Sequence, residues 1–167
     1  MCIDGPAGSG KTTLANRLGA ELGAPVLHID DLLEGWCGLE GMWPRLREGV
    51  LDQLAAGRPG RYRRYDWIAA TFAELRDVPV ADVLVLEGCG SARRAVDAVA
   101  ALRIWVEAPA DVRLARGLAR DGEAMRAHWV AWMRDEAVHF AAQATRSRAD
   151  VVVDGTGSPG DSGTIER

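Results

Sequence analysis

Near its amino end the chain carries Gly5-Pro6-Ala7-Gly8-Ser9-Gly10-Lys11-Thr12, an uninterrupted match to the phosphate-binding loop pattern G-x-x-x-x-G-K-[ST]. Its three glycines can adopt backbone angles closed to other residues, so successive N–H groups can turn inward around an anion. Lys11 is the one lysine among the 20 Lys and Arg residues. A compact ammonium suits a position between two phosphates better than a planar guanidinium does. The run therefore predicts a strand, a phosphate loop and a helix in that order.

We expect the helix to begin near Lys11, because leucines follow at helical spacing and an apolar strand end precedes the loop. The free N–H groups and the positive dipole end of such a helix strengthen an anion site. Thr12 offers a hydroxyl to Mg²⁺. The residues of this segment that we expect to bind ATP are Gly5, Ala7, Gly8, Ser9, Gly10, Lys11, Thr12 and Thr13.

The 167 residues, 48% hydrophobic and 26% charged, suit one globular domain. We expect this domain over residues 1–155 and a flexible tail, rich in Gly, Ser and Asp, over 156–167. No apolar run approaches the roughly 20 residues of a membrane span, and no basic segment followed by an apolar stretch marks an export signal. We therefore expect a cytoplasmic protein without a membrane partner.

The net charge of −4 argues against a nucleic acid as partner. The one segment that interleaves basic and aromatic residues, 61–65, is short, and we interpret it as solvated or facing a substrate. Cys2, Cys37 and Cys89 lie far apart without a C-x-x-C motif, which predicts reduced thiols rather than a zinc site or disulfides. The expected partner is a small-molecule acceptor, and a homodimer is left open.

Alternating apolar runs and helical patterns predict an α/β fold, in which helices cover both faces of a parallel sheet. The expected strands end at residue 3 and span 26–29, 83–86, 102–106 and 151–153. An amphipathic helix is expected around 43–54, and an irregular stretch containing Tyr65-Asp66-Trp67 follows it. In parallel sheets of this kind, ligands collect at the carboxyl ends of the strands.

Acidic residues stand at the carboxyl ends of two expected strands. Asp30 and Asp31 follow the second strand, and Glu87 follows the third. Phosphoryl transfer from ATP needs a metal site, a proton acceptor and positive charge around the migrating group. We interpret Thr12, Glu87 and Asp30 as metal ligands and Asp30 as the base. Asp31 is kept as the alternative base, and the other interpretation of both aspartates is that they cap a helix or turn.

A helix is expected to open at Pro109 and Asp111 and to carry three arginines at i, i+3 and i+7 on one face. These are Arg113, Arg116 and Arg120; Leu114, Ala115, Leu118 and Ala119 lie opposite, where they can pack. We interpret the end of this helix, about 116–124, as a lid that closes over a triphosphate. The alternative is a solvated basic face.

The next helix carries an apolar stripe made of Met125, Trp129, Trp132 and Phe140. Tryptophans at this spacing predict a core face. The alternative is that Glu136 or His139, which fall near the stripe, faces the pocket of the acceptor.

In this order, the loop, the Asp30 pair, Glu87-Gly88 and the arginine lid resemble the P-loop nucleoside and nucleotide kinases, most closely the uridine kinase-like branch, over residues 1 to about 155. The resemblance implies a three-layer sandwich with a five-stranded parallel sheet and a short lid. It implies ATP- and Mg²⁺-dependent transfer of the γ-phosphoryl group to a hydroxyl of a nucleoside or nucleoside-like compound. It assigns Asp30 as base for the sugar 5′-hydroxyl, Glu87 to Mg²⁺, and Arg116 and Arg120 to the phosphates.

Further positions are assigned through the same resemblance. Tyr65-Asp66 looks like the family's aromatic-Asp pair that grips ribose hydroxyls, and Arg93 can hold a phosphate as in nucleoside monophosphate kinases. The expected substrate contacts are thus Asp30, Tyr65, Asp66 and Arg93, and the expected catalytic residues are Asp30, Lys11, Arg116 and Arg120. The chain lacks the family's His-Pro sequence after the ribose aspartate. A nucleoside monophosphate kinase and a nucleotide-sensing module without kinase activity are the alternative functions.

Overall fold

The computed structural model describes residues 1–157 and 165–166. Its main sheet has the strand order β2-β5-β1-β6-β7-β8, with β1 near the centre. The strands of this sheet are β1 (Cys2–Asp4), β2 (Val26–His28), β5 (Val85–Glu87), β6 (Arg103–Glu107), β7 (Val151–Asp154) and β8 (Ile165–Glu166). The first five are parallel neighbours, as predicted, and the two-residue β8 adds an antiparallel edge.

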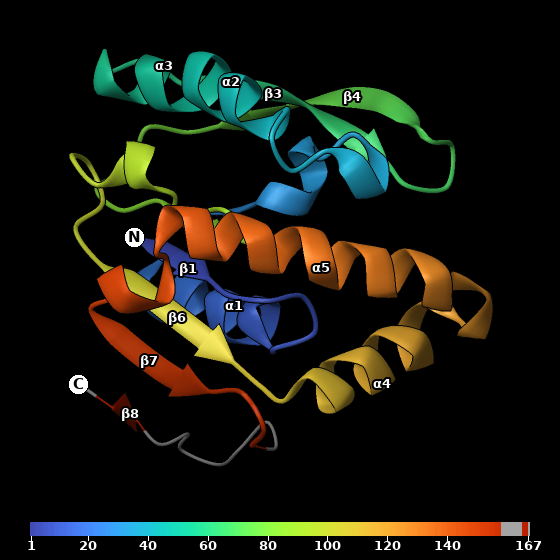
Figure 1. Cartoon of the computed structure of the whole chain (residues 1–167). Coiled ribbons are helices and arrows are strands. Elements are labelled where there is room, and N and C mark those ends of the chain that lie inside the picture. Colours follow the sequence, from blue (N-terminus) through green and yellow to red (C-terminus); the bar gives the residue numbers. More distant parts are fainter. Residues whose placement is uncertain (158–164, 167) are drawn as a thin grey trace.

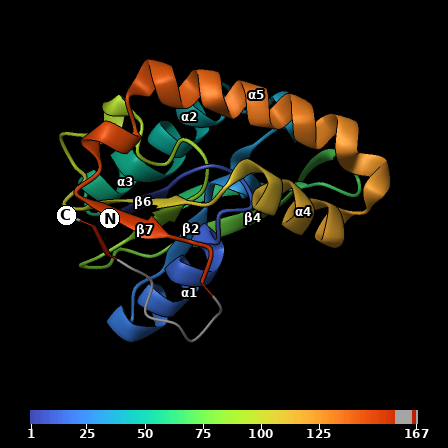
Figure 2. The same cartoon turned by 60° about the horizontal axis from the view of Figure 1, so that its bottom comes forward.

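Helices cover both faces of the sheet, which confirms the α/β prediction (Figure 1). The helices are α1 (Lys11–Leu22), α2 (Met42–Leu46), α3 (Asp52–Ala55), α4 (Ala110–Asp121) and α5 (Arg126–Gln143), with a π-helical turn at Arg47–Leu51 joining α2 to α3. Figure 2 shows α1 and α5 on opposite sides of the strands. Because strand side chains alternate, Ile3 and Val85 pack with Ala15 of α1, whereas Cys2 and Leu86 belong to the core that contains Trp132 of α5.

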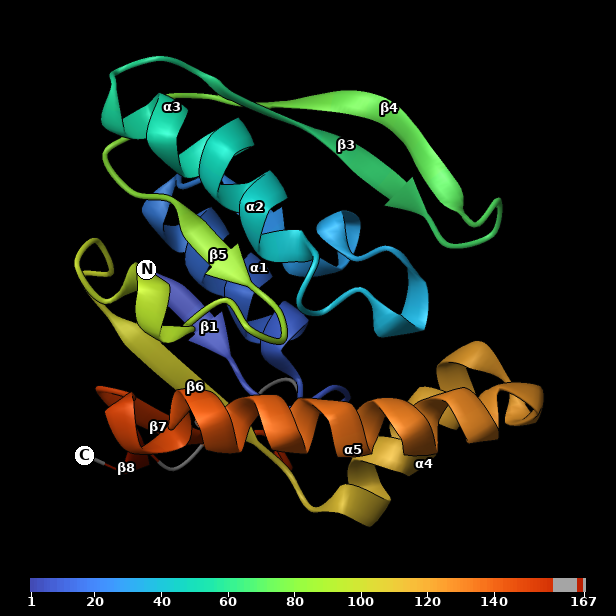
Figure 3. The same cartoon turned by 45° about the horizontal axis from the view of Figure 1, so that its top comes forward.

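The segment predicted to be irregular is a β-hairpin, so that prediction was wrong. β3 (Gly60–Asp66) and β4 (Thr71–Val78) pair antiparallel as a separate two-stranded sheet. The hairpin lies beside α2 and α3, away from β6 and β7 (Figure 3). Asp66 stabilises its turn, because the carboxylate Oδ1 accepts the N–H groups of Ile68 and Ala69, each at 2.9 Å. The turn brings Trp67 over the end of β2, where its Nε1 donates to the carbonyl of Asp30.

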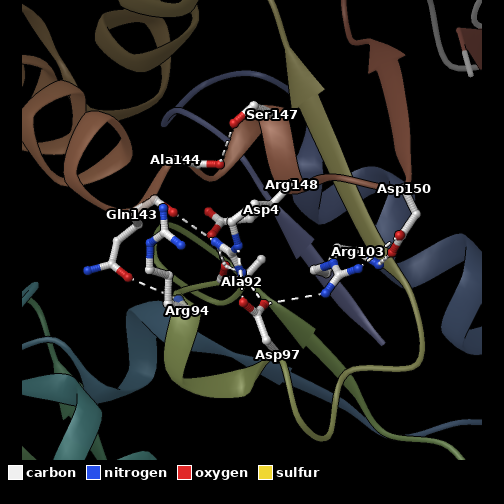
Figure 4. Close-up of polar contacts among 10 residues, drawn as sticks. All are labelled: Asp4, Ala92, Arg94, Asp97, Arg103, Gln143, Ala144, Ser147, Arg148 and Asp150. Atoms are coloured by element: carbon white, nitrogen blue, oxygen red, sulfur yellow. Dashed lines mark hydrogen bonds and ion pairs between the residues drawn. The ribbon is translucent and has the colours of Figure 1, made fainter.

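A polar network fixes the loop after β5 against the central strands (Figure 4). Arg148 donates to the carbonyl oxygen of Ala92 at 3.2 Å and pairs with Asp97, which also pairs with Arg103 of β6. From the other side, the carboxylate of Asp4 accepts the N–H of Ala92 at 2.8 Å. The loop that follows β5 is therefore held in place next to the end of β1.

Two sequence-based expectations concern the remainder of the chain. The flexible tail predicted for 156–167 falls largely outside the described residues, within which 165–166 pair with β7. Cys2, Cys37 and Cys89 are free thiols, as predicted. In the described part of the chain, no helix is both long enough and apolar enough to cross a bilayer.

Candidate active site

The phosphate loop lies between β1 and α1, as its sequence predicts. Gly5 and Gly8 have positive φ angles of 141° and 79°. A Cβ at Gly5 would lie 2.1 Å from the carbonyl oxygen of Val106, and one at Gly8 would lie 2.6 Å from that of Arg113. Only glycine therefore permits both the backbone angles and the close approach of β6 and α4 to the loop.

The buried carboxylate of Asp4 organises the entrance to this loop. It accepts the N–H of Gly5 at 2.7 Å and that of Gly90 at 3.0 Å, so that it ties the loop to the segment after β5. Burial raises the pKa of Asp4, although these N–H groups oppose the rise. Sequence analysis gave Asp4 no role, since the contact with Gly90 joins segments that are far apart in the chain.

Lys11 is 6% exposed, and its ammonium donates to the carbonyl of Pro6 at 2.9 Å, within the loop. Burial alone lowers the pKa of Lys11, but Cys89 and the carboxylates of Glu87 and Asp30 outweigh it and the net shift is upward. The ammonium is thus charged and positioned where a bound polyphosphate would meet it. Cys89 lies 3.9 Å from Nζ of Lys11, and burial raises the pKa of this thiol well above its usual value.

Glu87 forms the centre of an oxygen-rich group at the carboxyl end of β5. Its Oε1 accepts the hydroxyl of Thr12 at 3.2 Å, so the two side chains that we expect to bind Mg²⁺ lie next to each other. Its Oε2 lies 2.7 Å from Nδ1 of His28, and this hydrogen bond raises the pKa of the half-buried imidazole. The parallel register pairs His28 directly with Glu87 across β2 and β5. Sequence analysis missed the role of His28, because the sequence does not show which strands are neighbours or in which register they pair.

These oxygens fit Mg²⁺ better than a transition metal. No group of three or more His, Cys, Asp or Glu side chains suited to a metal ion is found within the described residues. Mg²⁺ is usually held by one or two protein oxygens together with phosphate oxygens and water, so a hydroxyl beside a carboxylate is sufficient. Thr12 and Glu87 would hold such an ion, and Asp30 lies at the edge of the same cavity.

Asp30 and Asp31 begin the short 3-10 helix η1 (Ile29–Leu32), immediately after β2. The carboxylate of Asp31 accepts the hydroxyl of Tyr62 at 2.9 Å, which fixes it against β3. The side chain of Asp30 is exposed to the cavity, and the protein walls of the cavity surround it. These walls displace bulk water and, together with the charge of Glu87, raise the pKa of Asp30, while Lys11 and Arg120 moderate the rise.

The arginine face of α4 points toward the phosphate loop, and all three of its arginines have partners within the protein. Arg113 forms a 2.7 Å ion pair with Glu136 of α5, and both side chains are nearly buried. Arg116 donates to the carbonyls of Gly8 at 3.2 Å and Gly155 at 2.9 Å. Arg120, with a 69% exposed side chain, pairs with neighbouring Asp121.

The opposite face of α4 does not pack as expected. Ala115 and Ala119 are exposed, whereas Gly117 is buried against Trp129 of α5. A Cβ at Gly117 would lie 2.3 Å from the indole ring. The prediction was wrong for these two alanines, whereas Leu114 and Leu118 of the same face are half-buried. Helix α4 also uses its arginines and Gly117 to pack against the loop and α5.

A cavity of about 610 Å³ opens between the phosphate loop, η1, the hairpin turn and the helices α4 and α5. The predicted site residues on its wall are Ala7, Gly8, Lys11, Thr12, Asp30, Glu87 and Arg120. A volume of this size holds a drug-sized ligand. The structure therefore brings to one cavity residues that we expect to bind phosphate, to hold the metal ion and to act as the base.

A family model described as AAA domain matches residues 1–139. The chain belongs to this family. The fold of this AAA-domain protein is similar to that of a possible uridine kinase from Bacillus stearothermophilus, with a TM-score of 0.62 and 24% identity over 90% of this chain and 85% of that one. TT1252 from Thermus thermophilus has a similar fold, with a TM-score of 0.52 and 24% identity over 94% of this chain and 88% of that one. For shikimate kinase from Acinetobacter baumannii, the TM-score is 0.52 and the identity is 17%, over 95% of this chain and 84% of that one. No curated protein matches the sequence.

Three residues predicted to contact substrate lie outside the cavity of this AAA-domain protein. Tyr65 is buried against Phe72 and Trp67, and Asp66 caps the hairpin turn. Arg93 extends over the ring of Trp43, 5.2 Å from its centroid, and pairs with Glu40. The hairpin turn places Trp67 and Ile68 at the cavity, rather than Tyr65 and Asp66. Arg93, which lies after β5, faces another surface.

The remaining predicted residues support the loop or flank it. Ser9 is fully buried in the loop, and Thr13 is exposed in the first turn of α1. Glu136 does not line the cavity but accepts the N–H of Ala7 at 2.7 Å, and His139 bonds Glu40 at 3.2 Å. The predicted apolar stripe of α5 is confirmed, with Trp129 and Trp132 both buried and both on the cavity wall.

Proposed function

We propose that this P-loop kinase fold carries out transfer of the γ-phosphoryl group of ATP to a hydroxyl group of a small molecule. The observation that carries the proposal is that Asp30 and the charged Lys11 line one cavity, beyond the carboxyl ends of β2 and β1, the two parallel strands that flank β5. A phosphoryl donor on the loop and a hydroxyl beside Asp30 would then meet within this cavity. Mg²⁺, when bound, would neutralise phosphate charge.

Asp30 is the better candidate for the base of the pair. Its raised pKa makes the Asp30 carboxylate a stronger base than an ordinary aspartate, so that it accepts a proton from a hydroxyl more readily. Asp31 is held by the Tyr62 hydroxyl, which occupies one of its oxygens. We therefore assign Asp30 to accept the proton of the attacking hydroxyl, and Lys11 and Arg120 to stabilise charge on the transferred group.

The acceptor that we propose is a nucleoside or nucleoside-like alcohol. The resemblance of the loop, the Asp30 pair and Glu87-Gly88 to the uridine kinase-like branch supports this choice, as does the fold shared with the possible uridine kinase. A nucleoside monophosphate is a weaker candidate, because Arg93, the residue expected to hold its phosphate, lies over Trp43 outside the cavity.

The test compares Asp30→Asn with the matched variant Asp31→Asn. Transfer from radiolabelled ATP to a panel of alcohols, uridine included, should fall by roughly 100-fold or more in Asp30→Asn. Binding of ATP, measured by calorimetry, should change little in either variant, and Asp31→Asn should keep most of the transfer activity. Transfer by Asp30→Asn at near the wild-type rate would refute the base assignment. ATP binding with only slow, acceptor-independent hydrolysis would favour a nucleotide sensor instead.

A further inference from the structure

Tryptophan side chains form much of the cavity wall outside the phosphate loop. Trp36 of the 3-10 helix η2 (Gly35–Cys37), Trp67 of the hairpin turn, and Trp129 and Trp132 of α5 all line it. The ring of Trp36 is the hub of this aromatic wall: its centroid lies 5.7 Å from that of Trp67, 5.9 Å from Trp129 and 6.2 Å from Trp132. Three segments far apart in sequence thus supply one aromatic surface.

The four rings differ in how they can meet a ligand. Trp129 and Trp132 are 1% and 4% exposed, so they form the packed back of the wall. Trp67 is 40% exposed, and Trp36 is partly exposed. Trp67 is also held in place, because its Nε1 donates to the carbonyl of Asp30 at 3.2 Å. An accessible ring is therefore fixed to the residue that carries the proposed base.

The polar groups of the cavity do not match an anionic acceptor. Its charged side chains are four carboxylates against two cations, Lys11 and Arg120. Lys11 lies within the phosphate loop, and Arg120 pairs with Asp121. Among the described residues, no further cation lines the wall near the tryptophans. An acceptor with a carboxylate or phosphate would add negative charge where no free positive group compensates it.

The uncharged side chains of the cavity also offer little that could read the edge of a ring by hydrogen bonds. Within the described part of the chain, no Asn, Gln, Ser or His side chain lines it, and the one hydroxyl, that of Thr12, already contacts Glu87. Selection among polar analogues depends on such positioned donors and acceptors. Stacking is different, because every flat ring offers a π-face to an indole.

We propose that the acceptor is an alcohol without negative charge whose hydroxyl is carried close to a flat aromatic or heteroaromatic ring, and that the face of this ring stacks on Trp67. The ring then meets Trp36 with its edge, because the planes of the two indoles are 76° apart and Trp36 is already stacked with His128. This inference rests on the proposed function and refines its acceptor class. It predicts broad tolerance of ring identity, since the ring is held by its faces rather than by its edge. The hydroxyl would then point past Trp67 to Asp30.

The experiment uses three matched alcohols: 2-naphthalenemethanol, its decahydro analogue with saturated rings, and 6-(hydroxymethyl)-2-naphthoate. Binding without ATP is followed by tryptophan fluorescence and calorimetry, and transfer is followed with labelled ATP. The flat neutral alcohol should bind and react roughly threefold to tenfold better than the saturated one, and better still than the carboxylate. Equal or better performance by the saturated or anionic alcohol would overturn the inference.

Variants locate the contact. Trp67→Leu should raise the dissociation constant and KM for the aromatic alcohol by roughly tenfold, while Trp67→Phe keeps most of the affinity. Leu75→Ala is the matched control, since Leu75 is exposed on the same hairpin and does not line the cavity. The affinity for ATP should stay within about twofold in all three variants. Unchanged affinity for the aromatic alcohol in Trp67→Leu, with a wild-type melting temperature, would refute the stacking site.

The two proposals fail in different ways. Tight binding of the aromatic alcohol without any phosphoryl transfer would reject the kinase proposal but leave the ring site intact. Efficient transfer to alcohols regardless of their rings would leave the kinase proposal intact and reject the ring site.

Discussion

Replacement of Glu136 by glutamine tests how the phosphate loop is supported. The Oε1 atom of Glu136 accepts the guanidinium of Arg113 at 2.7 Å, and its Oε2 accepts the N–H of Ala7 at the same distance. A glutamine has one carbonyl oxygen for these two donors, so its NH₂ group must face one of them. The side chain of Glu136 is 2% exposed and that of Arg113 is 11% exposed, so water cannot replace the lost acceptor.

Removal of one partner from a buried ion pair costs about 3 to 5 kcal/mol. Glutamine keeps the shape of the side chain and one hydrogen bond, and Arg113 retains the carbonyls of Ala7 and Ala108 as acceptors. We therefore expect a loss of about 3 kcal/mol in the free energy of unfolding. For a chain of this length, that loss lowers the melting temperature by roughly 6 to 12 °C. Weaker ATP binding should accompany it, because the N–H of Ala7 belongs to the phosphate loop.

Urea unfolding and calorimetric ATP titration provide the measurements. Glu123→Gln is the matched control, since Glu123 forms an exposed ion pair with Arg126 and its loss should hardly change stability. In Arg113→Met/Glu136→Gln, the two losses should be less than additive, because each single change breaks the same pair. A loss below about 1 kcal/mol for Glu136→Gln would refute the view that this pair holds the loop.

Three further predictions concern the loop, the lid and the metal site. Lys11→Ala should weaken ATP binding by roughly 10- to 150-fold in calorimetry, because it removes charged contacts to phosphate; near wild-type affinity would contradict the site. Gly117→Ala places a methyl group 2.3 Å from the ring of Trp129 and should lower the free energy of unfolding by about 1 to 3 kcal/mol in urea; an unchanged midpoint would contradict the packing. The hydrogen bond to Glu87 raises the pKa of His28 in the folded protein above its value of about 6.5 in the unfolded chain. This bond therefore stabilises the fold fully at a pH below about 6.5, and its contribution is lost as the pH rises through the pKa of the folded state. The melting temperature of wild type relative to His28→Gln should therefore be highest near pH 6 and fall at alkaline pH, and a parallel pair of pH profiles would exclude this role.

The sequence predicted the parallel sheet and the residues at its carboxyl edge because these features follow local rules. Apolar runs mark buried strands, and the glycines and lysine at this spacing predict a phosphate loop. Parallel topology then places Asp30 and Glu87 beside Lys11 without knowledge of any side-chain contact. The short β1 required no correction, since three residues are sufficient when both neighbours pair with them.

The hairpin could not be predicted in the same way, because its turn lacks the usual residues. The link between β3 and β4 contains neither glycine nor asparagine, and Ala70 adopts a positive φ of 52° that alanine rarely shows. Asp66 supplies the missing turn chemistry by bonding two backbone N–H groups. The aromatic wall depends on this hairpin, since Trp67 meets Trp36 only after the turn has formed.

The contacts of α4 were hidden for a different reason. Helical spacing shows that Arg113, Arg116 and Arg120 share a face, but it does not show what that face meets. Glu136 lies 23 positions after Arg113 and Gly155 lies 39 positions after Arg116, so these partners are set by the tertiary structure. Spacing alone therefore does not support the assignment of Arg116 and Arg120 to a triphosphate.

Arg113 and Arg116 attach the first two turns of α4 to the rest of the molecule, whereas Arg120 stands near its far end with most of its side chain in water. Ordering one residue of backbone costs about 1 to 2 kcal/mol, so a lid that had to fold from a loose segment would spend much of its binding energy on that step. In the kinase that we propose, α4 is already helical and only its end near Arg120 would have to move when a nucleotide binds. Little free energy would then be used to order the chain, and more of the free energy of the new contacts would contribute to the affinity for the nucleotide.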